Sequence, residues 1–145
     1  MARIVIDANV AVALAVPLPY SETAAKRVIE WQTSADEILA PNLWGYEVVS
    51  ALRKAVTAKA LSPDEADERL AFILSIGVRE IAPDLELHQQ ALHWAARLGQ
   101  GAAYDAAYLA LAEKLGATFW TGDRRLANNA RQTGVNWIHW IGENP

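Results

Sequence analysis

The chain has 145 residues, 52% of them hydrophobic, and its 13 basic and 17 acidic residues give a formal net charge of −4. This size and composition indicate one globular domain, 1–145, and the absence of cysteine excludes disulfides and thiolate metal sites and fits a reducing cytoplasm, where we expect the protein. A nonspecific nucleic-acid binder would usually be basic, so the total charge taken alone disfavours a nucleic-acid partner.

The first sixteen residues superficially resemble a secretory signal, because Arg3 precedes a run of apolar residues. Asp7 and Asn9 interrupt the stretch that an export signal keeps apolar, so we do not expect export. No segment of the sequence approaches 18 uninterrupted apolar residues, and no membrane span is therefore expected.

Strands and helices are predicted to alternate from the start of the chain. Residues 2–6 form a buried strand in this prediction, and the helix after it ends at the prolines 17 and 19. The elements expected next are a helix from Ser21, with Ser21 as its N-cap, a strand at 37–40 that stops at Pro41, and an amphipathic helix from Asn42 to Lys59.

The second half of the chain continues the alternation. The letters SPDE at 62–65 form a capping box, with Pro63 at the first helical position, and this helix ends near Gly77. The remaining expected elements are a strand at 78–82, a helix from Asp84, a helix at 102–116 closed by Gly116 in the left-handed conformation, a strand at 118–121, a short helix and a fifth strand at 135–140. Alternating strands and helices indicate an α/β sandwich around a parallel sheet, and no linker or repeat divides it.

Four acidic residues stand in apolar surroundings. Asp7 directly follows the first strand, and Asp123 follows the fourth; Glu47 and Asp105 lie in helices among apolar neighbours. Burying an isolated carboxylate is costly, so such groups become neutral, pair with a cation or bind a metal ion.

Each of these acids also has a structural alternative. Asp7 and Asp123 could N-cap the helices that follow them, and Glu47 could face solvent on a helix that carries basic residues at 53 and 54. Asp105 has the weakest alternative, because no basic residue lies within one helical turn of it.

The predicted topology favours a functional interpretation of the four together. The carboxyl ends of parallel strands meet at one edge of a sheet, and ligands bind there where the strand order reverses. If the first and fourth strands are neighbours, Asp7 and Asp123 face one crevice, which Glu47 and Asp105 can complete. Such an all-oxygen cluster suits Mg²⁺ or Mn²⁺, and these ions support metal-assisted hydrolysis of phosphodiesters.

This cluster changes what the net charge implies. Without the four acids, the remaining acidic residues equal the 13 lysines and arginines in number, and bound metal would offset the cluster itself. The charge then no longer argues against a polynucleotide substrate. Arg124 and Arg125, next to Asp123, are candidates for holding its backbone, with solvated surface as the alternative.

Four segments in this order resemble the PIN-domain nucleases, and among them most closely the VapC toxins of toxin–antitoxin pairs. The segments are VIDAN (5–9), NLWGYEVVSAL (42–52), AYDAAYLALA (103–112) and TGDRRL (121–126). The resemblance implies a three-layer sandwich whose central five-stranded parallel sheet has the order 3-2-1-4-5, with helices on both faces. It also implies an endoribonuclease that depends on Mg²⁺ or Mn²⁺, forms a homodimer and is inhibited by a cognate antitoxin.

Matched residue by residue, the resemblance places the acidic site at Asp7, Glu47, Asp105 and Asp123, with Asp7 and Asp105 as the principal metal ligands. Asn9 and Thr121 match positions that support the site by hydrogen bonds. The first motif often has Ser or Thr where Ala8 stands here, which removes a hydroxyl but no acid. The family's usual products, a 5′-phosphate and a 3′-hydroxyl, agree with water as the nucleophile.

Other interpretations compete with this one. A non-catalytic PIN-like scaffold would be expected to have lost at least one acid, and a receiver domain would carry a Lys after its last strand. A module in which the acids serve only as caps would show no response to Mn²⁺. The segment GQGAAY (99–104) lacks the third glycine of a dinucleotide fingerprint, and the histidines, His88, His93 and His139, show no metal-ligand spacing.

Overall fold

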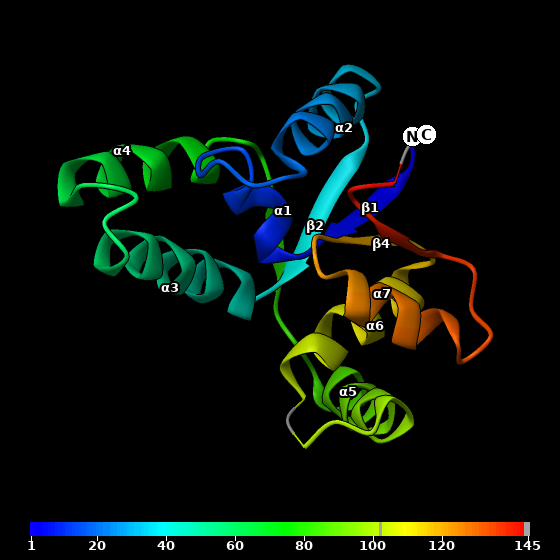
Figure 1. Ribbon diagram of the computed structural model, residues 1–145. Coiled ribbons are helices and arrows are strands. Elements are labelled where there is room, and N and C mark those ends of the chain that lie inside the picture. The colour runs from blue at the N-terminus through cyan, green and yellow to red at the C-terminus, as the bar shows by residue number, and fades with distance from the viewer. Residues whose placement is uncertain (102, 144–145) are drawn as a thin grey trace.

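Five parallel strands form one sheet in the order β3-β2-β1-β4-β5 (Figure 1). The computed structural model describes residues 1–101 and 103–143. The strands are β1 (Arg3–Ile6), β2 (Glu37–Pro41), β3 (Arg79–Ile81), β4 (Thr118–Thr121) and β5 (Ile138–Trp140). The strand order implied by the resemblance is thus confirmed, and the order reverses between β1 and β4, which pair directly.

Helices cover both faces of this sheet. Figure 1 shows α1 (Ala8–Val12), α2 (Ser21–Thr33), α3 (Leu43–Thr57) and α4 (Pro63–Leu74) on one side of it, and α5 (Leu85–Leu98), α6 (Tyr104–Leu115) and α7 (Arg124–Arg131) on the other. Each strand–helix–strand crossover joins parallel strands, so the chain must place a helix over one face before it returns. The predicted three-layer α/β architecture is confirmed.

The core lies between the sheet and its two helical layers. Val5 and Ile6 of β1 are completely buried, as expected for a central strand with helices on both faces. The α6 helix packs against β1, β2 and β4, and six of its residues are buried: Ala106, Tyr108, Leu109, Ala110, Leu111 and Ala112. Its alanines allow this close approach to the middle of the sheet, which brings the first turn of α6 to the carboxyl edge of the strands.

Local capping signals in the sequence have mixed outcomes. The capping box is confirmed, since Ser62 Oγ accepts from the Glu65 amide and the Glu65 carboxylate accepts from the Ser62 amide. Gly116 adopts the left-handed conformation with φ of 62°, as predicted. The prediction that Ser21 caps α2 is wrong, because Tyr20 is the N-cap and Ser21 is already helical. The Ser21 hydroxyl instead accepts from the Leu18 amide and stabilises the turn before the helix.

Element ends differ from the expected ones by a few residues. The α3 helix ends at Thr57 and α4 at Leu74, before the predicted Lys59 and Gly77, and the edge strands β3 and β5 are shorter than expected. Edge strands pair on one side only, which shortens the hydrogen-bonded part. The expected start of a helix at residue 102 lies outside the described residues, and α6 begins at Tyr104. None of the helices described in the structure is long and apolar enough to cross a membrane.

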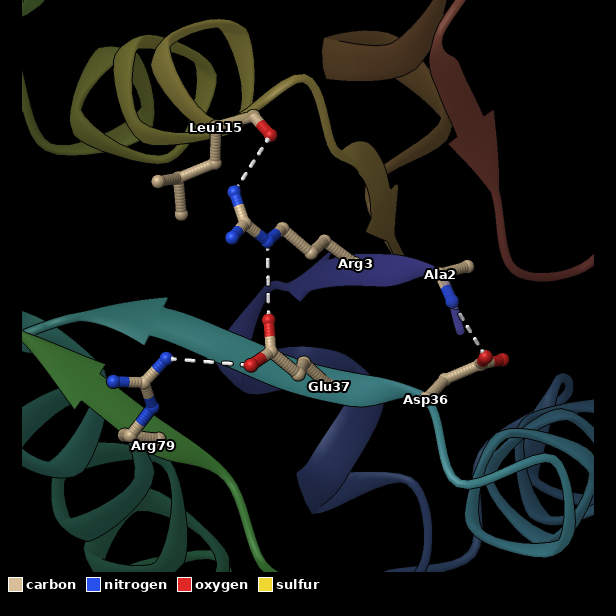
Figure 2. A network of polar contacts seen from close by, with 6 residues as sticks. All are labelled: Ala2, Arg3, Asp36, Glu37, Arg79 and Leu115. Carbon is tan, nitrogen blue, oxygen red and sulfur yellow. Dashed lines mark hydrogen bonds and ion pairs between the residues drawn. The ribbon is translucent and has the colours of Figure 1, made fainter.

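The amino edge of the sheet carries paired charges (Figure 2). Glu37 on β2 forms ion pairs with Arg3 on β1, at 3.1 Å, and with Arg79 on β3, at 3.8 Å. Arg3 also donates to the Leu115 carbonyl at the end of α6, and the Ala2 amide donates to Asp36. These exposed contacts contribute little stability each, but every acid among them has a nearby donor.

Candidate active site

Two of the four acids follow neighbouring strands at the carboxyl edge of the sheet. Asp7 comes directly after β1, and Asp123 comes two residues after β4. The Asp7 amide donates to the Trp120 carbonyl at 2.9 Å, so the parallel pairing of β1 with β4 continues up to Asp7. The predicted adjacency of these strands is therefore present, at the point where the strand order reverses.

Asp7 is a buried carboxylate, with 7% of its surface exposed. Its Oδ2 accepts a 2.8 Å hydrogen bond from the Thr121 hydroxyl and a 3.4 Å contact from the Asn9 amide group. Burial, with smaller contributions from the charges of Glu47 and Asp105, raises the pKa of Asp7 to about 7. The Asp7 side chain makes no capping bond to α1, so the capping alternative does not explain why a carboxylate stands here.

Thr121 and Asn9 link the end of β1 to the loop after β4. The completely buried Thr121 hydroxyl donates to Asp7 and accepts from the Asp123 amide at 3.0 Å. Asn9 Oδ1 accepts from the Gly122 amide at 2.7 Å. Both residues predicted to support the site thus hydrogen-bond to it or to its backbone, which limits how Asp7 and the Asp123 loop can move relative to each other.

Glu47 lies on the second turn of α3 and is bound by a tyrosine from the opposite helical layer. The Tyr108 hydroxyl on α6 donates a 2.6 Å hydrogen bond to Glu47 Oε1. Burial and the charge of Asp105 raise the pKa of Glu47, while this hydrogen bond lowers it. Within the described part of the chain, neither Arg53 nor Lys54 forms an ion pair with Glu47. A surface ion pair therefore does not explain this acid.

Asp105 occupies the first turn of α6, where Gln100 Nε2 donates to its Oδ2 at 3.1 Å. Burial, followed by the charge of Asp123, raises the pKa of Asp105. The charges of Glu47 and Asp105 act on Asp7, and the charge of Asp123 acts on Asp105, so each of the four acids lies within electrostatic reach of another. Across residues 1–101 and 103–143, no lysine, arginine or histidine forms an ion pair with any of them.

Asp123 is exposed and has a structural role as well. It is the N-cap of α7, and its Oδ1 accepts from the Leu126 amide at 3.1 Å, so the predicted capping alternative is correct for this residue. One carboxylate oxygen is used for the cap, which leaves Oδ2 without a protein hydrogen bond among the described residues. Capping and a role in the acidic cluster are therefore compatible.

The two arginines proposed to hold substrate are both exposed. The Arg124 guanidinium lies over the Trp140 ring, 5.0 Å from its centroid, and so is oriented by the C-terminal strand. Arg125 presents a charge beside Asp123 on the first turn of α7.

Two residues that contact the acids were missed in the sequence. Tyr108 lies one helical turn after Asp105 in the AYDAAY segment, but its apolar neighbours make it indistinguishable from a core tyrosine. Gln100 lies in GQGAAY, a segment considered only as a nucleotide-binding motif. Its Oε1 is buried without a partner, so the bond to Asp105 is the one hydrogen bond that the Gln100 side chain makes within the described residues.

The donor set fits a hard divalent cation in its chemistry. The four side chains offer only oxygen, and their mutual repulsion and burial favour a positive charge among them. In the described residues, however, no three acidic, histidine or cysteine side chains are close enough together to enclose an ion as they stand. Coordination by more than two of them therefore requires the carboxylates to turn toward the ion.

The fold and the acidic residues at its carboxyl edge are typical of one class of protein, and comparisons with known proteins identify that class. A family model described as PIN domain matches residues 4–132. The chain is 36% identical over 129 residues to Ribonuclease VapC3 of Pyrobaculum aerophilum, which covers 86% of this chain and 92% of that protein. It is 34% identical over 130 residues to Ribonuclease VapC12 of Mycobacterium tuberculosis, with 87% and 91% covered.

A solved structure of VapBC2 from Rickettsia felis, bound to a DNA fragment from their promoter, matches with a TM-score of 0.69. It covers 95% of this chain and 98% of that one at 12% identity, which shows a common fold. The chain belongs to the PIN-domain family, and its curated relatives place it with the VapC ribonucleases. PIN-domain ribonucleases generally use divalent metal ions.

Proposed function

We propose that this protein is an endoribonuclease that depends on Mg²⁺ or Mn²⁺ and is the toxin of a toxin–antitoxin pair. One observation carries the proposal: at the sheet edge where the strand order reverses, four carboxylates within electrostatic reach of one another have no cationic partner in the described chain. A protein that used these acids only for stability would pair or cap all of them. The 36% identity to a protein named a ribonuclease supports RNA as the substrate.

Asp7, Glu47, Asp105 and Asp123 would hold the metal, with Asp7 and Asp105 as its principal ligands. When bound, the ion supplies positive charge to the phosphate and lowers the pKa of water, the nucleophile of the proposed hydrolysis. The protein's own groups orient the ligands. Thr121 and Asn9 hold Asp7, Tyr108 holds Glu47, and Gln100 holds Asp105.

Arg125 and Arg124 would contact the RNA backbone beside the cluster. Both are exposed at the start of α7, next to Asp123. A cation there attracts phosphate without neutralising the carboxylates, because the guanidinium of Arg124 is oriented toward Trp140. Since the proposed substrate is cellular RNA, we place the activity in the cytoplasm.

Protein partners are also part of the proposal. The names of the curated relatives and the VapBC2 structure support an antitoxin partner, and the family supports a homodimer. Several large apolar side chains that are more than half exposed are consistent with both, among them Ile29, Phe72, Leu74, Leu85, Leu92 and Tyr104. Analytical ultracentrifugation of the purified chain tests the dimer directly.

The decisive experiment incubates RNA with purified wild-type protein and with Asp7→Asn and Asp105→Asn, each with Mn²⁺ and with EDTA. Asp64→Asn, on the exposed first turn of α4, is the matched control outside the cluster. We expect cleavage only by wild type and the control, and only with Mn²⁺. Equal cleavage by all four proteins would indicate a contaminating nuclease.

A non-catalytic PIN-like scaffold is the other function that the fold permits. It predicts no cleavage of any RNA and no rise in melting temperature with Mn²⁺. The nuclease proposal predicts that RNA is cleaved and that Mn²⁺ raises the melting temperature of wild type. The melting temperature of Asp7→Asn should respond much less to Mn²⁺.

A further inference from the structure

The side chain of Tyr20 lies directly against Gly122, in the loop that follows β4. A β-carbon built at position 122 would come nearest to the Tyr20 hydroxyl oxygen and would lie 2.6 Å from Cζ and 2.8 Å from Cε2, closer than real side chains pack. Glycine at 122 therefore lets the tyrosine ring rest on the backbone between Thr121 and Asp123. The ring comes from a different part of the chain, since Tyr20 is the N-cap residue of α2.

This packing brings the Tyr20 hydroxyl to the rim of the acidic cluster. Gly122 separates Thr121, whose hydroxyl donates to Asp7, from Asp123. Burial, and then the charges of Asp7 and Asp123, raise the pKa of Tyr20. The hydroxyl consequently remains protonated at neutral pH and is available as a hydrogen-bond donor.

In the described part of the chain, the Tyr20 hydroxyl has no hydrogen-bond partner. Tyr108, by contrast, is completely buried and its hydroxyl is bonded to Glu47. Tyr20 is only partly buried, and within residues 1–101 and 103–143 its hydroxyl makes no hydrogen bond and is not shut away from solvent. A ring packed against Gly122, with a hydroxyl that is not fully buried beside the acidic cluster, is suited to contact a ligand.

We propose that the Tyr20 hydroxyl donates a hydrogen bond to a non-bridging oxygen of the phosphodiester that the acidic cluster cleaves, and so positions the substrate. The inference rests on the proposed nuclease function. Carboxylates repel a phosphate, and a neutral donor attracts it without competing with a metal ion for their charge. Tyr20 thus provides on the α2 side what Arg125 provides on the α7 side.

The test compares wild type, Tyr20→Phe and the control Tyr46→Phe. Tyr20→Phe removes one oxygen and keeps the ring on Gly122; Tyr46 is 83% exposed on α3 and undergoes the same chemical change. The substrate is a fluorescein-labelled oligoribonucleotide copied from a site that wild type cuts in total cellular RNA. A hydrogen bond to a charged group is strong enough that we expect kcat/KM of Tyr20→Phe to fall about tenfold or more.

Two further readouts separate this role from a structural one. The melting temperature of Tyr20→Phe without metal, and its rise with Mn²⁺, should equal those of wild type, because neither the ring nor a carboxylate changes. Tyr46→Phe should keep kcat/KM within about twofold. If Tyr20→Phe also stays within twofold, or loses its response to Mn²⁺, the substrate contact is wrong.

Failure of the nuclease proposal would look different. In that case wild type itself cuts no RNA in the presence of Mn²⁺, and both proposals are overturned together. Cleavage by wild type with an unaltered Tyr20→Phe variant overturns the role of Tyr20 alone.

Discussion

The hydroxyl of Tyr108 and the carboxylate of Glu47 join the two helical layers across the carboxyl edge of the sheet. Their 2.6 Å hydrogen bond connects α6 with α3 over 61 residues of sequence. Tyr108 is completely buried, whereas Glu47 is partly exposed and has a raised pKa, so the bond fixes one oxygen of an otherwise movable acid. The geometry gives Glu47 a defined position without a cationic partner.

Tyr108→Phe should weaken the site and leave the fold intact. The substitution preserves the packed ring and removes only the bond to Glu47, whose freed oxygen can be hydrated. We expect a loss of about 1 kcal/mol or less in the free energy of unfolding, and a fall of about tenfold in kcat/KM with weaker Mn²⁺ binding. Calorimetric titration with Mn²⁺ measures the binding. Wild-type affinity in this variant would show that Glu47 needs no positioning.

Asp7 should make the metal-free protein less stable as the pH rises. Its pKa is about 7 in the fold against 3.8 ordinarily, so the folded state holds this proton more tightly than the unfolded chain. The corresponding stability is complete below the ordinary pKa and is lost as the pH rises through about 7. Urea unfolding between pH 4 and 8 in EDTA should show this decline.

Asp7→Asn removes the charge and should flatten that pH dependence. At pH 8 in EDTA we expect the variant to be more stable than wild type by on the order of 2 kcal/mol, while it cleaves no RNA. Mn²⁺ should stabilise wild type and have little effect on the variant. A pH dependence that is the same in both proteins would mean that Asp7 is not the group responsible.

Two substitutions of Asp123 should distinguish its role as a helix cap from its role in cleavage. Asn caps helices about as well as Asp, so Asp123→Asn keeps the bond from the Leu126 amide but loses the charge. Asp123→Ala loses both. We expect wild-type stability and greatly reduced cleavage for the first, and reduced cleavage with a further loss of about 1 kcal/mol for the second. Full activity in Asp123→Asn would assign this residue to capping alone.

Thr121 should be intolerant of the loss of its hydroxyl. Thr121→Val has nearly the same shape but removes the completely buried hydroxyl that donates to Asp7 and accepts from the Asp123 amide. We expect a loss of about 1–3 kcal/mol in unfolding free energy and reduced kcat/KM. Thr121→Ser retains the hydroxyl and should recover most of the activity. Equal defects in Val and Ser variants would instead implicate the methyl group and its packing.

Much of the fold followed from short-range patterns. The β-branched first strand, the capping box at Ser62 and the left-handed Gly116 are each determined by residues within about one turn of one another, and all three are present as predicted. Ser21 shows where such patterns fail. A serine before a helical pattern can cap it, but here the preceding turn recruits the hydroxyl and the helix begins one residue earlier.

The candidate acids can be recognised without a structure, because a carboxylate in an apolar segment conflicts with burial wherever the segment lies. The alternation of strands and helices can be recognised in the same way, because it depends on hydrophobic periodicity along the chain. The three-dimensional packing was needed to find the groups that hold those acids, Tyr108 for Glu47 and Gln100 for Asp105, and to place the Tyr20 ring against Gly122. These contacts depend on how separate helices pack over one edge of the sheet, and the hydrophobic pattern within a helix does not predict that packing.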